Sequence, residues 1–129
     1  MDALPDWPDG TVAILATGER HQIPVSLVHR AGDREIVIGL ATTRESLANI
    51  REDARCTLTV IAPGVAFTAY GTARTVDAEP IVAVAIEVGE IVDHRQDTFE
   101  IESGVAWHWT DDEAARRDAD ARDALRRLA

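Results

Sequence analysis

The chain has one cysteine and no long apolar run, and each of these shortages excludes a class of protein. A single cysteine, Cys56, forms no internal disulfide, so a disulfide-stapled secreted domain is excluded and a reducing, cytoplasmic compartment is expected. No run approaches the roughly 20 apolar residues of a membrane-spanning helix, so no membrane association is expected. The first ten residues, MDALPDWPDG, lack the basic and apolar regions of a signal peptide.

Positive charge is also scarce, because 23 acidic residues outnumber 13 basic ones and give a formal net charge of −10. This balance argues against nucleic acid as a partner. The sequence has no CxxC, HExxH, Walker-type, G-x-G-x-x-G or G-x-S-x-G motif. Four histidines are scattered without the spacing of metal ligands: His21, His29, His94 and His108. We therefore expect no metal site, and the sequence presents no catalytic constellation.

Short runs rich in β-branched residues make up most of the chain. They predict strands at residues 11–16, 23–29, 36–41, 56–62, 65–76, 81–94, 98–101 and 105–109. Gly71, in the interior of the strand predicted at residues 65–76, indicates a bulge or a close approach of another group. Residues 1–129, with 46% apolar content, are expected to form one mainly β domain. A closed or partly closed antiparallel barrel would remove the exposed edges of so many apolar strands.

Two helices complete the pattern. A short helix at residues 43–52 follows the third predicted strand, with Thr42 as its N-cap and Glu45 completing an S/T-x-x-E capping box. A second capping box, residues 110–113, opens a C-terminal helix with acidic-to-basic pairs at i,i+4 and a thin apolar stripe. Such a helix should lie on a surface.

The corner between the third strand and the short helix is the first candidate site. The first-turn amides and the helix dipole favour an anion there. Thr42, Thr43 and Ser46 add hydroxyl groups, and Arg44 adds a planar cation that suits phosphate. The alternative, that Thr42 and Glu45 only cap the helix, remains open.

Trp107 and Trp109 form the second candidate site. On a strand, residues two apart point to the same face, which would leave His108 on the other. The two indoles could be core or dimer-interface anchors, or they could be a stacking wall for a planar ring. Both interpretations remain open.

The order of these segments resembles the pyridoxamine 5'-phosphate oxidase-like family of split-barrel flavoproteins. The resemblance extends from about residue 11 to residue 92 and is carried by ERHQIPVSLVH, TTRESLANI, REDARCTLTV and AFTAYGTARTV. It implies an antiparallel split barrel of six or more strands that forms a homodimer. It also implies FMN, or in some branches a deazaflavin or haem, between the subunits, and an oxidoreductase with a small-molecule substrate.

The resemblance further implies which residues bind the cofactor. The residues on its ring side would be Pro24, Val25, Ser26 and Leu27, and those along its ribityl chain Gly39, Leu40, Ala41, Thr42 and Thr43. The phosphate would lie at Thr43, Arg44 and Ser46, with Gly71 beside the site. Trp107 or Trp109 would contact the flavin of the partner.

Ser46 stands where the family often has a lysine, a role that Arg44 could take. Two alternatives to an enzyme therefore stay open: a non-catalytic binding module for flavin, deazaflavin or haem, and a structural dimer with an empty site. In a flavoenzyme the cofactor carries the hydride chemistry, so the lack of a catalytic constellation does not argue against an enzyme.

Overall fold

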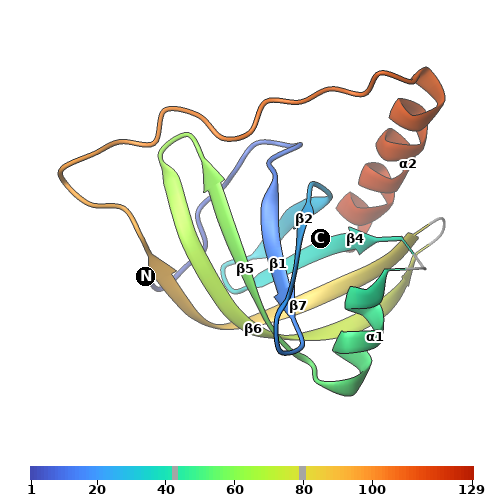
Figure 1. The fold of residues 1–129 in the computed structure, drawn as a ribbon, viewed down its shortest axis with the longest axis horizontal. Helices are drawn as coiled ribbons and strands as arrows, with labels where there is room; N and C mark the ends of the chain where they lie inside the picture. Colours follow the sequence, from blue (N-terminus) through green and yellow to red (C-terminus); the bar gives the residue numbers. More distant parts are fainter. Residues whose placement is uncertain (42–43, 79–80) are drawn as a thin grey trace.

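The computed structural model describes residues 1–41, 44–78 and 81–129, which form a seven-stranded antiparallel sheet and two helices (Figure 1). In chain order the elements are β1 (Ala13–Thr17), β2 (His21–Val25), β3 (Val28–Gly32), β4 (Glu35–Leu40), α1 (Glu45–Glu52), β5 (Arg55–Ala62), β6 (Val65–Ala78), β7 (Ile81–Asp93) and α2 (Asp112–Leu128). The strands lie in the order β2-β1-β5-β6-β7-β4-β3.

The sheet curls into a half-barrel around one apolar core (Figure 1). Along β1 and β5, core side chains such as Leu15 and Leu58 alternate with more exposed ones, as the two-residue period of a strand requires. The N-terminal segment covers part of this core, because Leu4 is buried and Trp7 packs on Phe67 with ring centroids 5.7 Å apart. The predicted mainly β split barrel, with one short and one C-terminal helix, is confirmed.

A β-bulge interrupts the pairing of β6 with β7, because Tyr70 pairs with Glu90 and Gly71 with Val88, which leaves Gly89 of β7 as the extra residue. A Cβ on Gly71 would lie 2.5 Å from the backbone oxygen of Glu87 and 2.8 Å from Ile86 Cγ2. Because backbone atoms cannot move aside cheaply, this position excludes a side chain. The predicted close approach at Gly71 is therefore confirmed.

The single strand predicted at residues 23–29 is wrong, because the structure has two strands there. β2 pairs with β1 at one edge of the sheet, and β3 pairs with β4 at the other. Pro24 lies in an edge strand, where its missing N–H leaves no ladder bond unmade. Ser26 and Leu27 carry the chain between the two edges, and Gly39 N donates to Leu27 O at 3.0 Å. This crossover brings the ends of β2 and β4 together.

The two strands predicted at residues 98–101 and 105–109 are also wrong, because residues 94–110 form no helix or strand. The segment passes the β5–β6 turn on its way to α2, and Gly64 N donates to Ile101 O at 2.9 Å (Figure 1). Two strands of four or five residues have too little apolar surface to form a stable hairpin by themselves.

Both predicted capping boxes are wrong. The N-cap of α1 is Arg44, whose side chain makes no capping hydrogen bond, and Glu45 is the first helical residue instead of the third. Thr42 lies outside the described residues. The N-cap of α2 is Asp111, whose carboxylate accepts a bond from Ala114 N at 3.3 Å. α2 lies on the surface as predicted, and neither helix of the described chain is long and apolar enough to cross a membrane.

Candidate functional site

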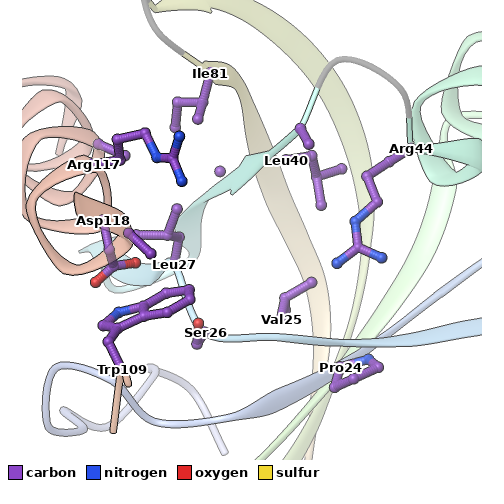
Figure 2. A pocket seen from close by; sticks show the side chains of 14 residues that line it. Pro24, Val25, Ser26, Leu27, Leu40, Arg44, Ile81, Trp109, Arg117 and Asp118 are labelled. Carbon is purple, nitrogen blue, oxygen red and sulfur yellow. The ribbon is translucent and has the colours of Figure 1, made fainter. Parts of the chain in front are cut away.

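A pocket of about 360 Å³ lies between the β2–β3 crossover, the end of β4 and α2 (Figure 2). Its volume is within the range of small-molecule sites, roughly 300–1,000 Å³. The lining residues are Pro24, Val25, Ser26, Leu27, Gly39, Leu40, Ala41, Arg44, Ile81, Trp109, Ala114, Arg117, Asp118 and Ala121.

Nine of the residues that the resemblance assigned to a cofactor line this one pocket: Pro24, Val25, Ser26, Leu27, Gly39, Leu40, Ala41, Arg44 and Trp109. The crossover and the end of β4 bring seven of them together from β2, at one edge of the sheet, and from β4, which lies next to the other edge. Three others, Ser46, Gly71 and Trp107, do not line it. Thr42 and Thr43 lie outside the described residues.

The floor of the pocket is apolar. Val25 and Leu40 are buried in the core, and Leu27 and Ile81 lie over Gly39. A Cβ on Gly39 would be 2.5 Å from Ile81 Cδ1 and 3.1 Å from Leu27 Cδ1. The absence of a side chain on Gly39 therefore leaves room for Leu27 and Ile81 over β4, where they form part of the apolar floor.

The charged side chains at the pocket give it a positive balance in a strongly acidic protein. Arg44 and Arg117 approach it from opposite sides, Arg44 from the start of α1 and Arg117 from α2 (Figure 2). Asp118 is the one acidic residue among the described lining residues, and its carboxylate is 3.1 Å from the guanidinium of Arg122. An anion is therefore the ligand that this electrostatic arrangement favours.

Of the two pocket arginines, Arg117 lies 3.9 Å from the acidic residue Glu113, and Arg44 has no such neighbour among the described residues. Its side chain is exposed, and no acidic side chain in residues 1–41, 44–78 and 81–129 pairs with it. The chain contains no lysine, so all 13 of its Lys and Arg residues are arginines. A planar guanidinium, suited to bidentate contact with phosphate or carboxylate, is thus the only side chain of permanent positive charge available to the pocket.

Arg122 joins α2 to the crossover. It is buried in the apolar face of α2, and its guanidinium donates to Asp118 at 3.1 Å and to Ser26 O at 3.3 Å. From the sequence, Asp118 and Arg122 were one of several acidic-to-basic pairs expected on the helix surface, so the role of Arg122 in docking the helix was not predicted. Its position between the buried residues Ala121 and Leu125 is the signal that could have found it.

The two tryptophans contact each other, with ring centroids 5.4 Å apart and an interplanar angle of 86°. The predicted shared strand face is wrong, since no strand forms there. Trp109 lines the pocket, whereas Trp107 Nε1 donates to Gly10 O at 2.8 Å. Both side chains are partly exposed, so within one chain neither is a core anchor. Trp107 instead holds the indole of Trp109 at the pocket.

Two buried polar atoms have no hydrogen-bond partner among the described residues: Ser46 Oγ and His29 Nε2. Ser46 is fully buried at the second position of α1, two residues after the pocket arginine Arg44. A buried hydroxyl without a partner costs about 1–3 kcal/mol, which makes the start of α1 a place that would gain from an added hydrogen-bonding group.

His29 lies on β3 beneath α2. Burial lowers its pKa below the ordinary value of 6.5, and the nearby guanidinium groups of Arg122 and Arg126 lower it further. The carboxylate of Asp9, 3.6 Å from Nδ1, opposes this shift. His29 is therefore held neutral under a helix whose facing side chains are cationic.

The remaining candidate chemistry is weak. Burial raises the pKa of the Cys56 thiol to about 11, so Cys56 is a small apolar residue and not a nucleophile. Among the described residues, no three His, Cys, Asp or Glu side chains are grouped so that they could hold a metal ion.

Solved structures provide the comparison with known proteins. HupZ of group A Streptococcus matches with a TM-score of 0.56 and 17% identity, over 76% of this chain and 90% of HupZ. A "putative pyridoxamine 5'-phosphate oxidase" from Lactobacillus delbrueckii matches with a TM-score of 0.57 and 15% identity, over 64% of this chain and 84% of that one. A protein of the same description from Listeria innocua matches with a TM-score of 0.56 and 11% identity, over 65% and 88%. The chain has the pyridoxamine 5'-phosphate oxidase-like fold.

No family model and no curated protein matches the sequence. At these identities the likeness to the oxidase-like structures is one of fold, and the resemblance drawn from the sequence is confirmed at that level. These structures each match 64–76% of this chain, so about a quarter to a third of the chain lies outside each match.

Proposed function

We propose that this protein is an FMN-binding split-barrel oxidoreductase that acts as a homodimer on a small-molecule substrate. The observation that carries the proposal is that residues assigned to a flavin site from separate parts of the chain line one pocket with an apolar floor and a cationic rim. The oxidase-like fold supports the same function by analogy.

The residues at the start of α1 fit the phosphate of FMN. Arg44 offers unpaired donors at the rim, the first-turn amides of α1 add the positive end of its dipole, and Ser46 Oγ lacks a partner behind them. Glu45 carries the opposite charge in the same turn, and His21 Nδ1 lies 3.6 Å from its carboxylate. When bound, FMN would supply hydride transfer, while the protein binds and orients the ring.

The ring of the flavin would lie over the apolar floor. Val25, Leu27, Leu40 and Ile81 offer a dry surface for it, and Trp109 offers an aromatic wall. By excluding water, these side chains would protect a bound flavin from side reactions.

A second copy of the chain would cover the outer face of β1, β5 and β6. On this face Ile14, Ile61 and Tyr70 are 40–46% exposed. The register places Ile14 beside Thr59, Thr59 beside Thr68, and Tyr70 beside Thr57, so the centre of the face carries no charged side chain. In a chain with 28% charged residues, an uncharged and partly apolar face is typical of the core of an interface.

The assembly is tested by light scattering. The wild type should have the mass of a dimer at micromolar concentration, and Ile61→Glu should be a folded monomer because it places a charge in the apolar face. Ala119→Glu, an exchange at an exposed position of α2 and away from that face, is the control and should remain a dimer. A monomeric wild type would reject the dimer.

The cofactor is tested by absorbance of the freshly purified protein and by titration with FMN and riboflavin. We expect flavin absorption bands and tighter binding of FMN than of riboflavin, because only FMN carries the phosphate that Arg44 would meet. A Soret band would favour haem binding. A colourless protein that binds neither flavin would support the structural dimer with an empty site.

A further inference from the structure

Residues 8–11 form a tight turn that contacts the C-terminal part of the chain. Thr11 N and Thr11 Oγ1 both donate to Pro8 O, at 3.2 and 2.6 Å. Gly10 has a φ of +80°, a backbone conformation that strongly favours glycine. The turn therefore has a defined shape, and we call these four residues the N-terminal turn.

The chain before this turn is attached to the sheet. Leu4 is buried, and its backbone N–H donates to Asp33 O at 2.8 Å. Trp7 Nε1 donates to Val28 O at 3.0 Å. The N-terminal turn is therefore held by the same sheet that forms the floor of the pocket.

Two contacts connect the N-terminal turn to one wall of the pocket. The carboxylate of Asp9 pairs with the guanidinium of Arg126 on α2. Gly10 O accepts a hydrogen bond from Trp107 Nε1 at 2.8 Å, and Trp107 packs edge-on against Trp109. Trp109 and α2 form this wall together (Figure 2). The turn thus holds the wall at two points.

The contact of α2 with the sheet is small. Val37 is buried but points away from the main core, because its neighbours Ile36 and Ile38 point into it. α2 lies over this outer face of β3 and β4 and covers Val37. Four of the 17 residues of α2 are buried. A helix with so few buried residues gains little from packing, so the two contacts with the N-terminal turn matter for its docking.

We propose that the N-terminal turn is a clasp that controls the α2 wall of the pocket. While Asp9 holds Arg126 and Gly10 holds Trp107, α2 and Trp109 stay in place; when both contacts break, α2 detaches and the pocket loses this wall. A ligand that contacts both sides of the pocket binds only the closed arrangement, so ligand binding and closing of the clasp reinforce each other. Only the coupling to FMN rests on the proposed function.

Thiol labelling measures the opening of the wall without any ligand. In a chain with Cys56→Ala and Val37→Cys, the new thiol lies beneath α2, so iodoacetamide modifies it only when α2 detaches. At pH 8, His29 beside Asp9 is neutral, because burial holds its pKa below 6.5. Under these conditions the labelling rate reports the population in which the clasp is open.

Asp9→Asn should speed this labelling about threefold, as expected for the loss of one exposed ion pair. Trp107→Phe keeps an aromatic ring but removes the N–H donor, and it should also speed labelling about threefold. The two substitutions break separate contacts, so the double variant should label about tenfold faster.

Three controls separate the clasp from a general loss of stability. Asp6→Asn, in the same segment, changes a side chain that is 98% exposed and should leave the rate unchanged. Arg116→Gln removes a charge from the exposed side of α2, outside the pocket, and should also leave it unchanged. In a chain with Val37 intact, Cys56 is buried in the main core and reports opening of the sheet, so Asp9→Asn should not change its labelling.

Equal rates in Asp9→Asn, Trp107→Phe and Asp6→Asn would overturn the clasp. A matching acceleration at Cys56 would also overturn it, because the whole sheet would then be opening.

The coupling to the pocket is tested with FMN. At ten times its dissociation constant, FMN should slow labelling of the thiol beneath α2 about tenfold, because it binds only the closed arrangement. Bound FMN without any slowing would overturn the coupling. If the protein binds no FMN, the flavin proposal fails, and the labelling rates without ligand still decide the clasp.

Discussion

The two sides of the pocket are built in different ways. On one side, Val25 and Leu40 belong to strands that are hydrogen-bonded into the sheet and buried in the main core. On the other, α2 rests on β3 and β4 through two alanines, one leucine and one buried arginine, after an irregular segment of exposed chain. The sheet side therefore fixes the shape of the pocket, and the helix side can loosen without unfolding the sheet.

The largest effect should follow from Leu40→Ala. Leu40 is 2% exposed, lies in β4 between β3 and β7, and reaches both the core and the pocket floor. Its truncation should lower the free energy of unfolding by about 2–5 kcal/mol. Urea denaturation followed by far-UV circular dichroism measures this loss. A loss under about 1 kcal/mol would mean that the sheet side is not the rigid side.

A smaller and more local effect should follow from Arg122→Met. The substitution keeps much of the apolar stem but leaves Asp118, whose side chain is 14% exposed, without its partner. We expect the substitution to weaken the docking of α2 by about 2–3 kcal/mol, which is less than the loss for a fully buried pair. Hydrogen exchange should speed up across residues 112–128 and not across β5 and β6.

The double variant Arg122→Met with Asp118→Leu is the control for this prediction, because it removes both charges and should restore most of the docking. Uniformly faster exchange throughout the sheet in the single variant would contradict the separation of the two sides.

The smallest effect should be a pH dependence of α2 docking through His29. Because the folded pKa of His29 lies below its unfolded value of 6.5, folding favours the neutral imidazole. The resulting stability is present above pH 6.5 and is lost as the pH falls through 6.5 toward the folded pKa. Protonation would place a cation beside Arg122 and Arg126, with only Asp9 to compensate.

Exchange across residues 112–128 should therefore accelerate between pH 7.5 and about pH 5.5, after correction for intrinsic exchange rates. In His29→Gln, which keeps a neutral polar side chain, that acceleration should be smaller. An identical pH response in the two proteins would assign the effect to other groups.

The same contrast explains which parts of the fold could be predicted from the sequence. β-branched runs predicted β1, β4, β5, β6 and β7 to within a few residues, because a buried strand needs such side chains at a period of two. The segment at residues 105–109 has one β-branched residue and two tryptophans, which also favour a strand, but it formed none, since it pairs with no other strand. A local sequence pattern does not show whether a segment will lie beside an unpaired edge of the sheet.

For the pocket, the family resemblance named the lining residues on the sheet side and Trp109, whereas the lining residues on α2 were not predicted. Pro24 to Leu27 and Gly39 to Arg44 stand in an order that resembles a known family, so that resemblance assigned them. Arg117 and Arg122 lie on a helix whose acidic and basic residues the sequence predicted to be ordinary i,i+4 surface pairs. Their roles depend on how α2 docks, a tertiary fact set by Ala121, Ala124 and Leu125.

The most direct test of the proposed function is the dissociation constant of FMN for the wild type, Arg44→Gln and Arg116→Gln, measured by quenching of flavin fluorescence. If the pocket holds FMN with its phosphate at the start of α1, Arg44→Gln should bind FMN about tenfold more weakly while its riboflavin affinity stays the same. Arg116→Gln should match the wild type. Equal FMN affinity in all three proteins, or no binding by any of them, would contradict the account.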